Sequence, residues 1–229
     1  MNFISHFYAD RTHTDSHFVI GSVSPDLLSI YNSQLRIKNS HLSKFEKTGD
    51  NTVSEGFWNG LERHFFVDKV FHSSPNFVIE TKKISTLLTE RFPHTETPRK
   101  FFIAHILLEL LLDKILIDQK PGILEAFYAH FSSQGDFSEI QRMTQLVSGN
   151  QLNSYDAFLR KFLDKKYLYH YQEYDHITYV MRRILRRVRI AEIGFLEQDA
   201  FLTLMQDYEK HLAGIHEIFF EEIRVKTQE

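Results

Sequence analysis

The sequence predicts an all-α protein, and three observations support this prediction. Apolar side chains recur at spacings of three and four residues along most of the 229-residue chain, as they do on one face of a helix. No run has the pattern of a buried strand. The breaks between the helical runs are short, and none is rich enough in Pro, Gly and Ser to be a domain linker. We therefore expect one domain over residues 1–229, a helical bundle of roughly eight or nine helices.

The N-terminal part of the chain gives mixed signals. Residues 1–10 alternate loosely and fit either a strand or the start of a helix. Residues 16–31 predict a helix that is interrupted near Gly21 and Pro25, because proline restricts the residue before it and suits the first turn of a new helix. Residues 32–50 are polar and basic, and they predict a loop with a short helix.

A long amphipathic helix is expected over residues 53–72. One face of it would carry Phe57, Leu61, His64, Phe65, Asp68, Phe71 and His72. A second helix over residues 76–91 should follow, and the sequence FPHTETP at 92–98 predicts a break after it.

The most apolar run of the chain, FFIAHILLELLLDKILI at 101–117, predicts the central helix. Thr97 is its expected cap and Pro98 its first residue. Pro121–Gly122 should end it. The run is too short and too interrupted by charge to cross a membrane, which takes about 20 largely uncharged residues. Further helices are expected at 125–133, 137–148, 155–164, 167–189 and 197–224.

Composition narrows the function classes. With 27 basic and 30 acidic side chains the net charge is −3, so nothing global suggests a nucleic-acid binder. The chain has no cysteine, which excludes disulfides, thiolate metal sites and a catalytic thiol. The N-terminus lacks the basic start and apolar core of a signal peptide. We expect a cytoplasmic protein without a membrane span; the sequence does not fix its oligomeric state.

Two apolar helices each carry a histidine four residues before an acid. The pairs are His64 with Asp68 and His105 with Glu109. Residues four apart lie on the same helix face, so each imidazole points the same way as its carboxylate. Such a pair is often only a helix-stabilising contact, and a single buried histidine is often only hydrogen-bonded to the backbone. Both interpretations stay open beside a metal site.

These pairs, together with His6 near the N-terminus and Asp26 at the expected bend, form the candidate ligand set. A mixture of imidazoles and carboxylates suits Mn, Zn or Fe, and this set could hold one or two divalent ions. His72 continues the face of His64 and Asp68 and is a further candidate. A metal-activated water can attack a phosphorus or a carbonyl carbon.

A basic cluster follows later in the chain, in the segment MRRILRRVRI. It contains Arg182, Arg183, Arg186, Arg187 and Arg189. Cations near a helix C-terminus are favoured by the helix dipole, so a solvated face is one interpretation. The other is an anion clamp, because arginine binds phosphate in a bidentate manner; Arg183 and Arg187 would then hold the substrate phosphate.

The order of several short motifs resembles the acyl-carrier-protein phosphodiesterase family, a distant relative of the HD-domain metal hydrolases. The motif MNFISH places His6 on the family histidine, and GSVSPD places Asp26 on the family aspartate. The motif GLERHFFVD matches a family helix at His64 and Asp68. The resemblance spans about residues 1–190. It implies an HD-domain-like all-α fold and a divalent-metal phosphodiesterase that cleaves phosphopantetheine from acyl carrier protein.

The central helix departs from the family pattern. In HILLEL, His105 and Glu109 stand where the family has two aspartates, and Leu110 replaces a histidine. Phe65 replaces the arginine after the family histidine. These changes bear on the substrate more than on the metal site.

The functional hypothesis is a metal-dependent phosphodiesterase or phosphohydrolase. It would act on a phosphoester substrate, with acyl carrier protein as one candidate. Its metal ligands would be His6, Asp26, His64, Asp68, His105 and Glu109, and either Asp68 or Glu109 would orient the attacking water. The alternative is a catalytically inactive helical binding module that retains the fold.

Overall fold

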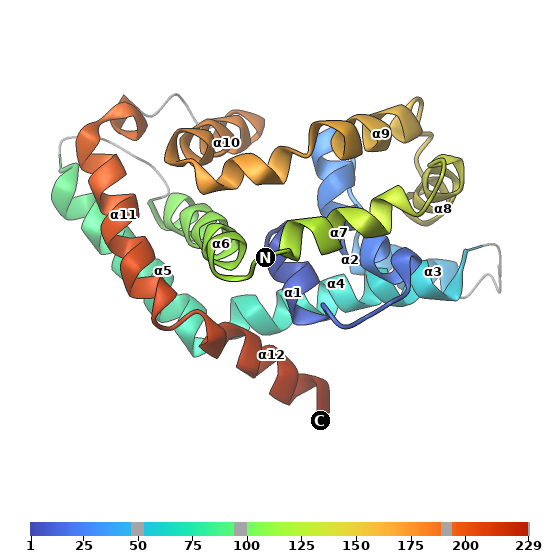
Figure 1. Cartoon of the computed structure of the whole chain (residues 1–229), viewed down its shortest axis with the longest axis horizontal. Coiled ribbons are helices and arrows are strands. Elements are labelled where there is room, and N and C mark those ends of the chain that lie inside the picture. The colour runs from blue at the N-terminus through green and yellow to red at the C-terminus, as the bar shows by residue number, and fades with distance from the viewer. Residues whose placement is uncertain (47–52, 94–99, 189–193, 229) are drawn as a thin grey trace. The chain divides into compact units, whose positions relative to one another are not determined.

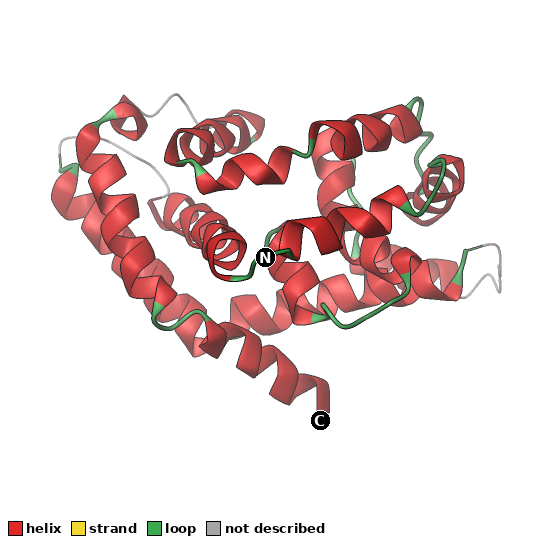
Figure 2. Cartoon of the chain, in the orientation of Figure 1, coloured by secondary structure: helices red, strands yellow, loops and turns green. Residues whose placement is uncertain are grey.

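A computed structural model describes residues 1–46, 53–93, 100–188 and 194–228. All regular secondary structure in these residues is helical, which confirms the all-α prediction (Figure 2). None of the described helices has the length and apolar content needed to cross a membrane, as the sequence predicts.

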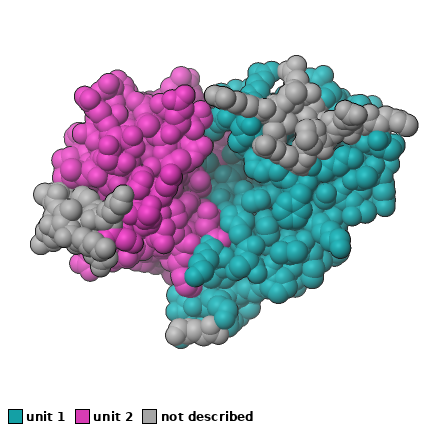
Figure 3. Space-filling model, turned by 180° about the vertical axis from the view of Figure 1, so that it is seen from behind, with its two compact units in different colours: residues 1–5, 69–121, 169–229 teal, residues 6–68, 122–168 magenta. Residues whose placement is uncertain are grey.

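The described chain divides into two compact units, coloured separately in Figure 3. Unit 1 comprises residues 1–5, 69–121 and 169–229, and unit 2 comprises residues 6–68 and 122–168. Whether the chain forms one domain stays a prediction.

Unit 2 contains the helices that carry the predicted site residues His6, Asp26, His64 and Asp68. Its elements are α1 (Phe3–Ala9, from His6), α2 (Ser16–Tyr31), α3 (Asn39–Glu46), α4 (Glu55–Ser73, as far as Asp68), α7 (Ile123–Ser132), α8 (Ser138–Ser148) and α9 (Tyr155–Lys165). Helix α2 packs against α7, and α8 packs against α3 and α9.

Unit 1 is built around the apolar helix α6. It contains the start of α1, the end of α4, and then α5 (Pro75–Arg91), α6 (Lys100–Gln119), the 3₁₀ helix η1 (Tyr167–Gln172, from Tyr169), α10 (Tyr174–Arg187), the 3₁₀ helix η2 (Gly194–Glu197), α11 (Asp199–Ala213) and α12 (Glu217–Gln228). Helix α6 packs against α5, α10 and α11 (Figure 1). The run expected to be the central helix is thus a buried helix, and its predicted cap at Thr97 and Pro98 lies outside the described residues.

The predicted break in residues 16–31 is wrong, because α2 runs without interruption through Gly21 and Pro25. An interior proline costs about 3 kcal/mol. The helix buries an apolar face that offsets this cost, and the Ser24 hydroxyl donates to the Ile20 carbonyl 2.8 Å away. Tertiary packing has overridden the local signal.

Other element boundaries also differ from the prediction. Residues 1–10 contain the helix α1, so the strand interpretation is wrong there. The expected helix at 167–189 is divided into η1 and α10, and the one at 197–224 is divided after Ala213, where Gly214 follows α11. The described residues therefore form twelve α-helices and two 3₁₀ helices instead of the expected eight or nine.

Helices α2 and α4 cross at two glycines. A Cβ atom on Gly60 would fall on the backbone oxygen of Phe18 and lie 2.8 Å from the backbone nitrogen of Ser22 and 3.0 Å from the Cα atom of Gly21. A Cβ atom on Gly21 would fall on the backbone oxygen of Phe57 in α4. Only glycine permits this approach, since the atoms in the way belong to the backbone.

A buried carboxylate in α6 holds the first turn of α1. Asp113 is fully buried, and it accepts hydrogen bonds from the Ile4 amide (3.1 Å), the Ser5 amide (2.8 Å) and the Ser5 hydroxyl (2.7 Å). Burial raises the pKa of Asp113 to about 7, against the opposing effects of these hydrogen bonds and of the N-terminal amino group. The start of α1 is thus tied to α6 by a group that titrates near neutral pH.

We predict that Gly60→Ala lowers the free energy of unfolding by about 1–3 kcal/mol, because backbone atoms of α2 have to move away from the added methyl group. Chemical denaturation measures this change. Gly214→Ala is the matched control, since a Cβ atom there meets its nearest neighbour at an ordinary 3.5 Å. Equal losses in the two variants would contradict the proposed close contact.

We predict that ionisation of Asp113 costs stability as the pH rises. Its folded pKa is raised from 3.8 to about 7, so its contribution is fully present below the unfolded pKa and is lost as the pH rises to the folded pKa. The loss should be on the order of a few kcal/mol. Urea unfolding of the wild type and Asp113→Asn at several pH values between about 4 and about 8 measures it. Parallel pH profiles for the two proteins would show that the prediction is wrong.

Candidate metal centres

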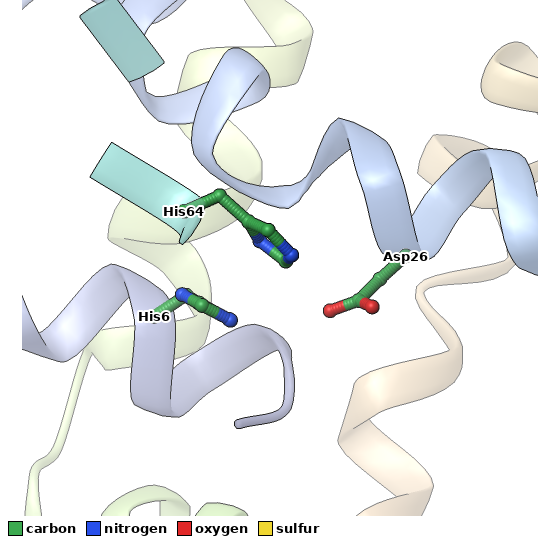
Figure 4. Close-up of side chains that lie close together, drawn as sticks. All are labelled: His6, Asp26 and His64. Atoms are coloured by element: carbon green, nitrogen blue, oxygen red, sulfur yellow. The ribbon is translucent and has the colours of Figure 1, made fainter. Parts of the chain in front are cut away.

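Among the described residues, two groups of three side chains could each hold a metal ion, and each group lies within one compact unit. The first centre, in unit 2, consists of His6 on α1, Asp26 on α2 and His64 on α4. One ligand atom from each of these residues lies within 4.8 Å of the others. Figure 4 shows the two imidazole rings and the carboxylate directed toward a common space.

The crossing of α2 and α4 fixes the orientation of His64. This residue lies one turn beyond Gly60, and its Nδ1 atom is 2.8 Å from the backbone oxygen of Ser22 in α2. A carbonyl oxygen only accepts, so Nδ1 carries the proton and donates. The Nε2 atom of a neutral His64 is therefore left with its lone pair, which is the form that binds a metal.

His6 presents a second buried nitrogen to the same space. Its side chain is 1% exposed, and its ring stacks on that of His64 with 4.3 Å between centroids. Among the described residues, no group forms a hydrogen bond with His6 Nε2. Burial lowers the pKa of His6, as does the neighbouring His64, while the Asp68 carboxylate acts in the opposite direction. His6 is therefore neutral near pH 7 and suited to ligation.

Asp68 faces both imidazoles from the next turn of α4. Its Oδ1 atom is 3.4 Å from His6 Nε2 and its Oδ2 atom is 3.7 Å from His64 Nε2, distances too long for strong hydrogen bonds. Burial alone would raise the pKa of the Asp68 carboxyl, but the net direction is downward, with His6 and His64 among the groups that lower the pKa. An ionised carboxylate thus stands beside the ligand atoms.

The second centre lies in unit 1 and joins His105 and Glu109 of α6 to His72 of α4. The Nε2 atoms of His72 and His105 are 3.0 Å apart, and each lies 2.9 Å from Glu109 Oε1. The Met1 amino nitrogen is 3.1 Å from the same oxygen. Burial alone would raise the pKa of Glu109, but the amino group and the hydrogen bonds from His105 and His72 hold it well below its usual range.

Five of the six predicted ligands fall in these two groups, and Asp68 belongs to neither. His105 and Glu109 were predicted in one set with His6, and the structure places them with His72 instead. The signal for His72 was its position on the apolar face of α4. Leu110, at the position where the family that the motifs resemble has a histidine, is 2% exposed.

The basic cluster belongs to neither group. Arg183 and Arg187 lie in the last turns of α10 in unit 1, and the Arg183 guanidinium donates to the Tyr179 hydroxyl at 2.9 Å. Arg189 lies outside the described residues. Binding of substrate phosphate by Arg183 and Arg187 stays a prediction.

Comparison with protein-family models, with curated proteins and with solved structures finds no significant match to this chain. The family resemblance, the HD-domain-like fold and the substrate it implies stay predictions from the sequence motifs.

We predict that Mn²⁺ or Zn²⁺ raises the melting temperature of metal-stripped protein, because an ion that binds only the folded state stabilises it by about 2.7 kcal/mol at 100 times its dissociation constant. The isosteric variant Asp26→Asn should show a smaller rise than the wild type, since it loses an anionic ligand. His170→Ala, which removes an exposed histidine, is the control and should match the wild type. Equal rises in the wild type and Asp26→Asn would contradict ligation by Asp26.

Proposed function

We propose that the protein is a divalent-metal-dependent phosphoester hydrolase and that its reaction takes place at the first centre. The main support is the convergence of two buried imidazole nitrogens with a carboxylate. His6 Nε2 is buried without a hydrogen bond among the described residues, His64 Nε2 is left unprotonated in the neutral ring, and Asp26 completes the group.

These three residues fit a catalytic metal ion. Zinc enzymes commonly use three protein ligands and keep a further position open, and the combination of two imidazoles with a carboxylate also suits Mn and Fe. When bound, such an ion would supply an activated water and would neutralise charge on a phosphoryl oxygen. His6, Asp26 and His64 would hold the ion.

The remaining residues supply orientation. The backbone of Ser22 fixes the ring of His64, which keeps Nε2 directed at the site. Asp68 stands within 4 Å of both ligand nitrogens and is half-buried, so it can hold a water molecule beside them. We assign Asp68 the role of orienting the attacking water. The family resemblance implies that the substrate is acyl carrier protein and that the bond cleaved is a phosphodiester.

One observation favours the alternative of an inactive binding module. Leu110 lies in the apolar core where the family has a histidine, so this position supplies no ligand or acid. In that case the first centre would bind no ion, or would bind one without turnover.

We predict that the metal-loaded protein hydrolyses bis-p-nitrophenyl phosphate or p-nitrophenyl phosphate. Asp68→Asn should lower kcat by about 10²-fold, because the attacking water is no longer held by a carboxylate, and should leave the metal content of the first centre in place. Asp26→Asn should lower metal content and activity together. Release of nitrophenol and elemental analysis measure the two effects, with His170→Ala as the control. Metal binding without hydrolysis of either compound would refute the proposal that the protein is a hydrolase, but not the proposal that the first centre binds metal.

A further inference from the structure

In the second centre, three polar atoms lie so close together that no placement of their protons makes all three contacts favourable. Three atoms form a nearly equilateral triangle: the Nε2 atoms of His72 and His105 and the Oε1 atom of Glu109, with sides of 2.9–3.0 Å. A ring nitrogen carries at most one proton, and Glu109 Oε1 also lies 3.1 Å from the Met1 amino nitrogen, as in an ion pair between an ammonium group and an ionised carboxylate. The triangle therefore allows few distributions of protons.

Each distribution leaves at least one repulsive contact. If both Nε2 atoms are protonated, two N–H groups face each other at 3.0 Å. If only one is protonated, the other nitrogen directs its lone pair at the carboxylate oxygen from 2.9 Å. A cation bound by all three lone pairs removes the conflict. The Met1 amino group contacts the same carboxylate oxygen, and an ion would share that oxygen with it.

The sides of the triangle are compatible with one class of ion. Adjacent ligands lie about 3.0 Å apart around a six-coordinate ion with bonds of about 2.1 Å, and about 3.4 Å apart around a tetrahedral one. The observed sides of 2.9–3.0 Å match the six-coordinate case. Two imidazoles and one carboxylate on one face are a ligand set of six-coordinate divalent transition metals such as Fe²⁺ and Mn²⁺.

The surroundings of the triangle are those of a site that an ion can enter. The Phe77 ring meets the rings of His72 and His105 edge-on, at centroid distances of 5.0 and 4.9 Å, and forms an apolar wall. The two imidazole side chains remain 31% and 27% exposed, so solvent reaches the group. The carboxylate is 17% exposed.

We propose that His72, His105 and Glu109 form a second metal centre that binds a six-coordinate divalent transition metal. This proposal does not rest on the proposed hydrolase, because the first centre has other ligands. The competing explanation is a hydrogen-bonded cluster that stabilises unit 1 and binds no ion.

The test is Mn²⁺ binding to the full-length, metal-stripped protein, followed by electron paramagnetic resonance and calorimetry. We expect His72→Ala and Glu109→Gln each to remove one class of bound Mn²⁺ and to retain the class that Asp26→Asn removes. His170→Ala should keep both classes. Co²⁺ at the second centre should show the weak visible absorption of a six-coordinate ion, not the strong absorption of a tetrahedral one.

The variants separate the two proposals. Loss of Mn²⁺ in His72→Ala alone would support the second centre and refute the first, and loss in Asp26→Asn alone would do the reverse. Unchanged Mn²⁺ binding in both His72→Ala and Glu109→Gln would refute the second centre. The melting temperature of each metal-stripped variant shows whether it is folded. If His72→Ala does not fold, the test relies on Glu109→Gln, which conserves the shape of the side chain.

Discussion

The contact between Gly21 and Gly60 is the constraint on which the first centre depends. Because neither residue has a Cβ atom, the backbones of α2 and α4 meet there, and the carbonyl of Ser22 comes within reach of the His64 ring. The ring is then held by the main chain of another helix, which a side-chain rotation cannot move. A larger residue at either glycine would separate the helices, and His64 would lose both its hydrogen-bond acceptor and its orientation.

The fold class could be predicted from the sequence because apolar spacing reports directly on helices. The ends of helices were harder to predict, because they depend on contacts between residues distant in the chain. Pro25 is an example: proline usually ends a helix, but α2 buries a long apolar face and continues through it. The division of the C-terminal region at Gly214 was missed for the opposite reason, since the apolar pattern continues across the turn.

The candidate sites show the same limit. A spacing of four residues predicts that His64 and Asp68, or His105 and Glu109, share a face, and in the structure each pair does approach. Spacing within one helix says nothing about which other helix faces it. His72 therefore could not be chosen over His6 as the partner of His105, although it was already visible on the face of α4.

The hydrogen bonds that Asp113 accepts from the first turn of α1 affect the order in which the helices fold. Helix α1 has seven residues, too few to be stable by itself in water, and its first turn is tied to a residue more than a hundred positions later. Closing so long a loop has an entropic cost that is recovered only when α6 is already formed. We infer that α1 is a late element of the fold. His6 then takes its place only after α6 has formed, so a partly folded chain would have an incomplete first centre.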